Sequence, residues 1–275
     1  MSKAMQLKAK IKNLAQKNHV PAQAVLQNFM LERLLERMSI SKYKDIVILK
    51  GGMLIASLVG VYNRTTMDMD ATMRGYPLSE DTTRAAFSDI CAIQLDDEVT
   101  LALDHIETIR DTDEYGGYRV ALIAKYESIT TPLKIDITTG DIITPKAVRY
   151  AFHSNFENKV IKVWAYNSET ILAEKVETIL RRSVLNTRPR DFYDVYIIMK
   201  THRQVIDKDI FITALNATSK KRMSLATLQD KEKIIRTIQS DAIMRQRWER
   251  YCKANYYAKN IAFDEVIRVL IEIVK

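Results

Sequence analysis

The chain has 275 residues, of which 47% are hydrophobic, so it can bury the core of one large globular domain or two modest ones. Its two cysteines, Cys91 and Cys252, lie far apart and lack metal-ligand spacing, which argues against a disulfide framework and a zinc site. The most apolar stretch, 53–62, is too short to span a membrane, and the lysine-rich N-terminus does not resemble a signal peptide. We therefore expect a cytoplasmic protein that has no membrane partner.

The first half of the chain is predicted to alternate helices and strands. Hydrophobic periodicity predicts two helices within 3–38, with Pro21 in the first turn of the second helix. Short runs with β-strand patterning predict five strands, namely 45–49, 66–72, 100–110, 118–126 and 133–138. The third and fourth strands would form a hairpin, because a turn containing Asp113, Gly116 and Gly117 separates them.

Three aspartates are predicted to lie on the polar faces of these strands. The alternation in 66–72 places Asp68 and Asp70 on one face and Met69 on the other. The strand 133–138 likewise has Asp136 on its polar face. Acid-x-acid pairs are frequent by chance, and a solvated strand face is the alternative interpretation for Asp68 and Asp70. For Asp136 the alternative is a hydrogen-bonded carboxylate at a strand edge. What favours a site is the order of a strand, a Gly-Gly turn, a helix and then two acidic strands.

This arrangement of carboxylates suits nucleotidyl transfer. A triphosphate is strongly anionic, so divalent cations must neutralise it before a nucleophile reaches the α-phosphorus. Mg²⁺ prefers carboxylate oxygens and keeps several waters, so Asp68, Asp70 and Asp136 could hold it together with substrate phosphates. The turn at Gly51 and Gly52 would let backbone amides approach those phosphates at the start of a helix.

After Trp164 the pattern becomes helical. Ser168 is predicted to cap a helix that continues through Leu180. Further amphipathic segments follow, namely 192–200, 210–215, 228–238 and 263–274. We therefore predict an α/β N-terminal domain over 1–165 and a helical, basic C-terminal domain over 166–275.

Most of the net charge of +8 lies in the predicted helical region. Residues 219–260 contain eleven basic and four acidic residues, whereas 96–114 contain eight acidic residues and one arginine. Such asymmetry favours a polyanionic partner such as RNA. Aromatic residues among these cations could stack on unpaired bases or belong to a helical core: Trp248, Tyr251, Tyr256 and Tyr257. Solvated helical faces are an equally simple explanation of the basic residues.

Four motifs occur in a specific order between about residues 45 and 200. They are Leu49-Lys50-Gly51-Gly52 with Arg64-Thr65-Thr66-Met67-Asp68-Met69-Asp70, Lys134-Ile135-Asp136-Ile137, Glu169-Thr170-Ile171-Leu172-Ala173-Glu174-Lys175, and Arg188-Pro189-Arg190-Asp191-Phe192-Tyr193-Asp194. Together they resemble the AbiEii toxin family, a branch of the polymerase-β-like nucleotidyltransferases. The resemblance implies a polymerase-β-like nucleotidyltransferase core with a mixed sheet, followed by the helical C-terminal domain.

The resemblance also implies roles for individual residues. Asp68 and Asp70 would bind Mg²⁺, and Asp136 matches a third carboxylate that helps activate the attacking hydroxyl in many relatives. Lys175 would bind the nucleotide phosphates, and Asp191 would be a catalytic residue. For these two the alternatives are a helix-surface ion pair for Lys175 and a helix cap for Asp191.

One position departs from the wider superfamily. A serine that bonds a phosphate usually follows the first glycine, whereas this chain has Gly52 and then Met53. That hydroxyl contact would have to come from Thr65, Thr66 or backbone amides.

By this resemblance the protein is the toxin of a bacterial toxin–antitoxin or abortive phage-infection system. It would transfer a nucleotide from a nucleoside triphosphate, with GTP as the first expectation, to an RNA acceptor, with tRNA as the first expectation. Its antitoxin would be a transcriptional repressor that need not bind the toxin. A housekeeping or antibiotic-modifying nucleotidyltransferase and a non-catalytic nucleic-acid-binding protein are the alternatives.

Overall fold

The computed structural model describes residues 2–109 and 116–275, so the predicted turn residue Asp113 lies outside the described residues. The chain divides into two compact units. Unit 1 comprises residues 1–141 and 148–165, and unit 2 comprises residues 142–147 and 166–275. No helix among the described residues is long and apolar enough to cross a membrane.

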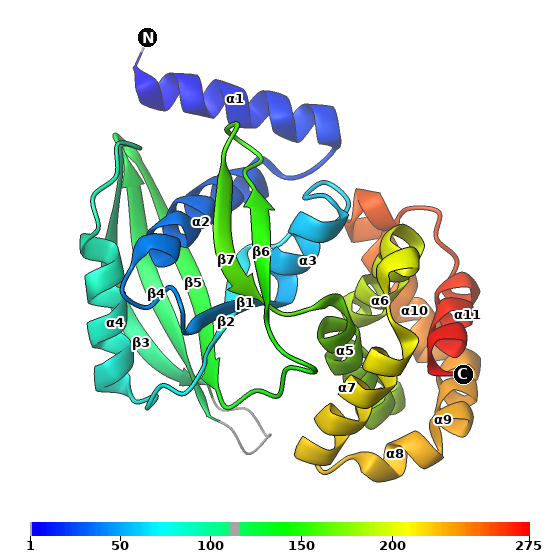
Figure 1. Ribbon diagram of the computed structural model, residues 1–275. Helices are drawn as coiled ribbons and strands as arrows, with labels where there is room; N and C mark the ends of the chain where they lie inside the picture. Colours follow the sequence, from blue (N-terminus) through cyan, green and yellow to red (C-terminus); the bar gives the residue numbers. More distant parts are fainter. Residues whose placement is uncertain (1, 110–115) are drawn as a thin grey trace. The chain divides into compact units, whose positions relative to one another are not determined.

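Unit 1 is a mixed seven-stranded sheet with helices packed on it (Figure 1). Its helices are α1 (Lys3–Asn18), α2 (Ala22–Ile40), α3 (Gly51–Val59) and α4 (Glu80–Ala92). Its strands are β1 (Val47–Lys50), β2 (Asp68–Met73), β3 (Val99–Ile109), β4 (Gly117–Tyr126), β5 (Ile129–Thr139), β6 (Val148–His153) and β7 (Val160–Ala165). The strand order is β3-β4-β5-β2-β1-β7-β6, with β2–β5 and β1–β7 parallel and the other pairs antiparallel.

The core of unit 1 lies on one face of this sheet. Met69 and Ala71 of β2 and Ile135 and Ile137 of β5 are fully buried. Ala71 lines a small cavity with Leu35 and Met38 of α2, so α2 covers this apolar face. Because side chains alternate along a strand, the aspartates of β2 and β5 project from the opposite face.

Helix α2 is buried along most of its length and carries charged residues into the interior. Arg37 makes two hydrogen bonds to the carboxylate of Asp97, at 2.7 and 2.9 Å. Glu32 accepts hydrogen bonds from Ser154 and Asn155 in the β6–β7 hairpin, at 2.6 and 2.7 Å. These partners satisfy charges that would otherwise be costly to bury, and they fix the hairpin on α2.

Unit 2 is helical. Its α-helices are α5 (Ser168–Arg182), α6 (Pro189–His202), α7 (Lys208–Lys221), α8 (Leu225–Gln229), α9 (Lys231–Ser240), α10 (Ala242–Ala254) and α11 (Phe263–Val274). Short 3₁₀ turns lie at η1 (Ser183–Leu185), η2 (Arg203–Val205) and η3 (Tyr256–Ala258). The sequence prediction of a mixed α/β core followed by helices is confirmed.

Several predicted boundaries were wrong for local reasons. Asn167, and not Ser168, caps α5, because its side chain accepts the hydrogen bond from the Thr170 amide. The predicted helix 228–238 is interrupted at Asp230, between α8 and α9. Helix α6 begins at Pro189, three residues before the predicted start, because proline suits the first turn of a helix.

Candidate functional site

Four charged residues occupy one transverse row of the sheet in unit 1. Lys50 on β1 pairs in register with Asp70 on β2, Asp70 with Asp136 on β5, and Asp136 with Arg119 on β4. Register partners on neighbouring strands project their side chains from the same face. Two carboxylates therefore lie next to each other, with one cation on either side of the pair.

Asp68 lies on the same face, two residues before Asp70 on β2. It is exposed to solvent, whereas Asp70 is half-buried and the intervening Met69 is fully buried. The predicted alternation of strand β2 is thus present. Both aspartates of the Asp68-x-Asp70 pair are presented from one side of the sheet.

Gly51 allows helix α3 to begin directly beside Asp70. It adopts φ of +63°, and a Cβ atom at this position would lie 2.0 Å from Oδ2 of Asp70. The amide of Gly52 donates a hydrogen bond to that same Oδ2, at 3.2 Å. The N-terminal end of α3 is thus directed at the Asp70 carboxylate. Any other residue at position 51 would be strained and would displace the carboxylate.

The loop between α3 and β2 is held under Gly52 by Arg64 and Thr66. A Cβ at Gly52 would lie 2.8 Å from both Nη1 of Arg64 and Oγ1 of Thr66. The buried Arg64 donates to the carbonyl of Thr65 at 2.9 Å, and Thr66 Oγ1 donates to the carbonyl of Asp68 at 3.2 Å. Thr66 therefore positions Asp68 by a hydrogen bond to the backbone carbonyl of Asp68. Arg64 was quoted at the start of this motif segment but was given no role in the sequence analysis.

Asp136 is held in a two-pronged ion pair. Nε and Nη2 of Arg119 each donate to one oxygen of its carboxylate, both at 2.8 Å. This hydrogen bonding, with the negative charges of Asp136, Asp68 and Glu107, raises the pKa of Arg119. Sequence reasoning missed Arg119, because only the β4–β5 register brings it opposite Asp136.

Lys50 forms a second polar cluster at the other end of the row. Its Nζ donates to Thr138 Oγ1 at 2.8 Å and to Asp141 Oδ2 at 2.6 Å. The hydroxyl of Thr138 also donates to Asp141, at 2.7 Å. This cluster fixes the end of β5 against β1.

In unit 2, Lys175 on α5 lies between two carboxylates of α6. Its Nζ is 2.7 Å from Asp191 Oδ1 and 3.1 Å from Asp194 Oδ2. Both aspartates are buried, and Oδ2 of Asp191 has no hydrogen-bond partner among the described residues. Asp194 was quoted in the fourth motif but given no role. Its spacing of three residues from Asp191 was the available signal, because such residues share a helix face.

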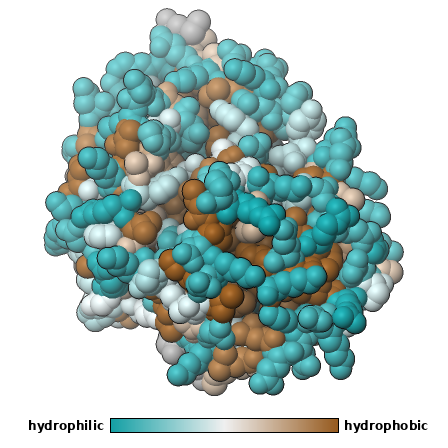
Figure 2. Space-filling view, turned by 45° about the vertical axis from the view of Figure 1, so that its right-hand side comes forward, coloured by the Kyte–Doolittle hydropathy of each residue, from teal (hydrophilic) through white to brown (hydrophobic). Residues whose placement is uncertain are grey.

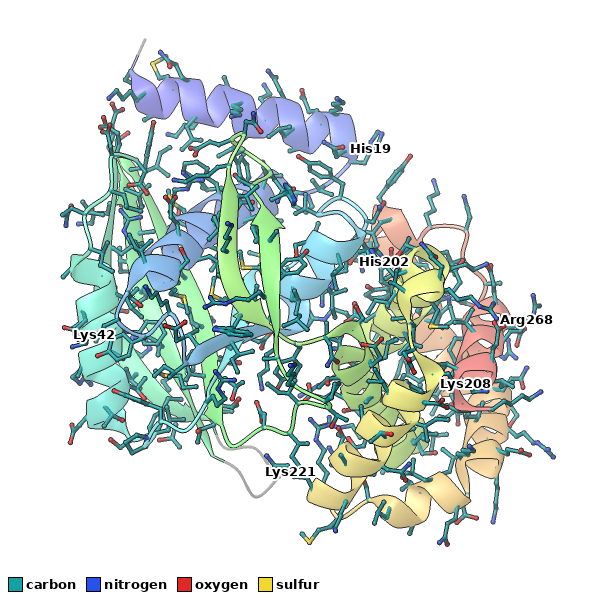
Figure 3. The ribbon with its side chains drawn as sticks, in the orientation of Figure 1. His19, Lys42, His202, Lys208, Lys221 and Arg268 are labelled. Carbon is teal, nitrogen blue, oxygen red and sulfur yellow. The ribbon has the colours of Figure 1, made fainter. Side chains whose placement is uncertain are left out.

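Many of the basic residues of 219–260 have structural partners within unit 2. Arg222 donates to Glu177 at 2.6 Å, and Arg245 donates to Asp264 at 2.8 Å. Arg247 donates to the carbonyls of Val184 and Asn186. Lys221, another basic residue of the stretch, is the last residue of α7, and Lys208 is the first residue of that helix (Figure 3). Six other basic residues of the stretch are exposed: Lys220, Lys233, Arg236, Arg250, Lys253 and Lys259.

The aromatic residues of the same stretch mostly belong to the core. Trp248 is buried and donates from Nε1 to the carbonyl of Ile261 at 2.8 Å. Tyr251 and Tyr257 pack against Tyr193, and their hydroxyls lie 3.2 Å apart. Only Tyr256, which is 56% exposed, combines exposure with proximity in sequence to the basic residues.

Hydrophilic residues cover much of the face seen in Figure 2, with hydrophobic ones in patches between them.

Within residues 2–109 and 116–275, no group of three or more histidine, cysteine, aspartate and glutamate side chains is arranged to hold a metal ion. Two carboxylates, those of Asp68 and Asp70, nevertheless share one face of strand β2. Asp136, their neighbour in the sheet, has both carboxylate oxygens engaged by Arg119.

Solved structures with a similar fold cover nearly the whole chain. A crystal structure of a candidate nucleotidyltransferase from H. pylori aligns with a TM-score of 0.50 at 16% identity, covering 93% of this chain and 94% of that one. JHP933 from Helicobacter pylori aligns with a TM-score of 0.48 at 18% identity, covering 92% and 90%. At these identities the first likeness shows a shared fold. No protein of curated function matches the chain.

The family of the chain follows from its sequence match. The model of the family described as "Nucleotidyl transferase AbiEii toxin, Type IV TA system" matches residues 33–269. This range contains β1 through β7, the row of charged residues, and the Lys175–Asp191–Asp194 cluster. The chain belongs to the AbiEii nucleotidyl transferase toxin family of type IV toxin–antitoxin systems.

Proposed function

We propose that this toxin transfers a nucleotide from a nucleoside triphosphate, GTP first among the candidates, to an RNA acceptor such as tRNA in a Mg²⁺-dependent reaction. The observation that carries the proposal is the shared face of Asp68 and Asp70, beside the N-terminal turn of α3. Family membership supports the nucleotidyltransferase chemistry, and the excess of basic residues supports an RNA acceptor.

The residues of unit 1 fit a magnesium ion that is shared with the substrate. Mg²⁺ is commonly bound by one or two carboxylates together with substrate phosphates and water, and Asp68 and Asp70 supply two carboxylates on one strand face. When bound, the ion would neutralise the triphosphate and orient its leaving pyrophosphate.

The protein groups around this pair hold and orient it. The Gly52 amide fixes one oxygen of Asp70, and Thr66 fixes the backbone of Asp68. In the proposed reaction Asp136 accepts the proton of the attacking hydroxyl, a role for which one of its oxygens must be released from Arg119. In unit 2, Lys175 is proposed to bind the nucleotide phosphates, as its family motif implies, with Asp191 as its hydrogen-bonded partner.

The biological role proposed is growth arrest. In a cell infected by phage, this arrest would abort the infection. Modification of an RNA needed for translation would stop growth, and an antitoxin repressor encoded beside the toxin would limit its synthesis. Such an antitoxin acts on transcription and need not bind the toxin. Expression of the toxin alone should therefore inhibit growth.

The test is transfer of label from each α-labelled triphosphate to total RNA in the presence of Mg²⁺. Wild type should label RNA and inhibit growth, and Asp68→Ala should do neither while keeping its circular dichroism spectrum. Asp104→Ala is the matched control, because Asp104 is an exposed aspartate on β3 of the same sheet. Labelling of small molecules in place of RNA would indicate an antibiotic-modifying enzyme. Unchanged transfer by a folded Asp68→Ala variant would refute the assignment.

A further inference from the structure

Arg119 occupies both oxygens of the third carboxylate while remaining accessible to solvent. Its guanidinium faces Asp136 with two parallel hydrogen bonds of 2.8 Å, and 41% of its side chain is exposed. While this fork persists, both carboxylate oxygens of Asp136 are engaged by hydrogen bonds from Arg119, so neither is open to the proton of an attacking hydroxyl. As long as the pair persists, Asp136 is poorly suited to the role proposed above.

The surroundings of Arg119 are rich in negative charge. Its register partner on β3 is Glu107, its partner on β5 is Asp136, and Asp68 is close enough to raise its pKa. A triphosphate that approaches this face therefore meets several carboxylates and needs a cation as well as the metal. Lys50, at the other end of the row, is only 13% exposed and is hydrogen-bonded to Asp141 and Thr138.

A phosphate group can replace the carboxylate of Asp136 as the partner of Arg119. The planar guanidinium binds carboxylate and phosphate oxygens in the same two-pronged geometry. An exchange of one anion for another keeps both charge-assisted hydrogen bonds of the guanidinium. The exposed edge of the pair gives an incoming phosphate access that a buried ion pair would deny.

We propose that Arg119 is a phosphate-binding residue that holds Asp136 until a nucleoside triphosphate arrives. The guanidinium then transfers its hydrogen bonds to the β- or γ-phosphate of the substrate, and the oxygens of Asp136 become available to the acceptor hydroxyl. Binding of the triphosphate thus prepares the base, and an acceptor that arrives first meets an occupied carboxylate. This inference rests on the proposed function and assigns a role to a residue outside the four family motifs.

The test compares how Arg119 contributes to binding of ligands that differ only in phosphate number. Calorimetry in Mg²⁺ would use a GTP analogue with a non-hydrolysable α–β bridge, and GMP. Arg119→Gln should weaken binding of the triphosphate analogue by about tenfold or more, as expected for charge-assisted hydrogen bonds. Its effect on GMP should be much smaller. Arg119→Lys, which keeps the charge but not the fork, should lie between wild type and Arg119→Gln.

A second readout follows the guanidinium directly. The ¹⁵N resonance of Arg119 Nε, assigned by its disappearance in Arg119→Gln, should shift on addition of the triphosphate analogue and not on addition of guanosine. Arg149→Gln is the matched control, because Arg149 is paired with Asp45 at 3.0 Å on β6 of the same sheet. This control should bind the analogue like wild type.

The outcomes separate this inference from the proposed function. Failure of wild type to bind any triphosphate would refute the nucleotide site itself. Normal binding by wild type with equal affinity in Arg119→Gln, or an equal loss for GMP and the triphosphate, would refute the role of Arg119 alone. A resonance that stays unshifted at saturating analogue would show that Arg119 remains a structural partner of Asp136.

Discussion

Asp70 and Asp136 are register partners on the parallel strands β2 and β5, although 66 residues separate them in sequence. Asp70 accepts from a backbone amide of α3, whereas Asp136 accepts from the side chain of Arg119. Neighbouring carboxylates are therefore held by different kinds of group, one by the backbone and the other by a side chain. A side chain can change its rotamer more easily than a backbone amide at a helix start can move, which agrees with the proposed release of Asp136.

Gly51→Ala should abolish transfer without changing any charged residue. The new Cβ would meet Oδ2 of Asp70 at 2.0 Å, so the carboxylate must move. Gly75→Ala is an unusually close control, because Gly75 has the same φ of +63° but no atom within 4 Å of the added Cβ. Both variants should lose about 1–2 kcal/mol of stability from the left-handed backbone. Activity assays and urea unfolding would separate the two effects, and equal activity of both variants would contradict the proposed importance of Asp70.

Lys175→Met should destabilise unit 2, because it removes a cation that contacts the two buried carboxylates of Asp191 and Asp194. Removing one partner of a buried ion pair typically costs about 3–5 kcal/mol. The triple variant Lys175→Met, Asp191→Asn and Asp194→Asn should recover much of that loss, because no unpaired charge remains. Thermal unfolding would measure both variants.

The same triple variant tests the phosphate role of Lys175 without the complication of unfolding. If Lys175 binds phosphates, a folded triple variant should still bind triphosphate more weakly, by about 2 kcal/mol. Calorimetry gives the affinity. Wild-type affinity in a stable triple variant would leave Lys175 with a purely structural function.

RNA binding should depend on the exposed cations of unit 2 and not on those with structural partners. Replacing Lys220, Lys253 and Lys259 with Gln should weaken RNA binding and flatten its salt dependence, because fewer counterions are released. The control replaces Lys8, Lys12 and Lys17, which are exposed on α1 and lie outside the matched family range. The net charge falls equally in both variants. Equal salt slopes for the two triple variants would show that net charge alone sets RNA affinity.

Stability should depend on pH through Glu32. Burial raises the pKa of this carboxyl, although hydrogen bonds from Ser154 and Asn155 oppose the effect. A raised folded-state pKa means that the native protein binds this proton more tightly than the unfolded chain does. Wild type should therefore lose stability relative to Glu32→Gln as the pH rises from about 4 to about 7. Urea unfolding at both pH values gives the difference, and a gain of wild type over that range would reverse the sign and refute the shift.

The sequence predicted those parts of the fold and candidate site that depend on local pattern. The alternation around Asp68 and Asp70 was sufficient to assign their common face, because the period of a strand is two. The strands β6 and β7 and the helices α4 and α10 were missed, since their apolar positions are few or irregular. The pairing of β2 with β5 is a property of the whole sheet, and no local signal records it.

Partners of side chains were hardest to predict. Nothing near Arg119 in sequence indicates that it faces Asp136. Lys175 was predicted to bind phosphates, with an ion pair on its own helix as the alternative, and neither interpretation included its contacts with Asp191 and Asp194 on α6. Trp248 lies among cations in sequence, yet its indole is buried against Ile261. In each case a long-range contact, fixed by packing, decides between two interpretations that the sequence allows.

Unit 1 is completed by residues 148–165, which follow a segment of unit 2 in the chain. This order has a consequence for folding during synthesis. Strand β1 has been synthesised once the ribosome has passed residue 50. Its parallel partner β7 is synthesised only when the ribosome reaches residues 160–165 (Figure 1). Until then β1 presents an open edge, and Glu32 on α2 lacks Ser154 and Asn155. A chain that is released before this point has an incomplete sheet. Completion of the nucleotidyltransferase sheet is thereby deferred until well over half of the toxin has been made.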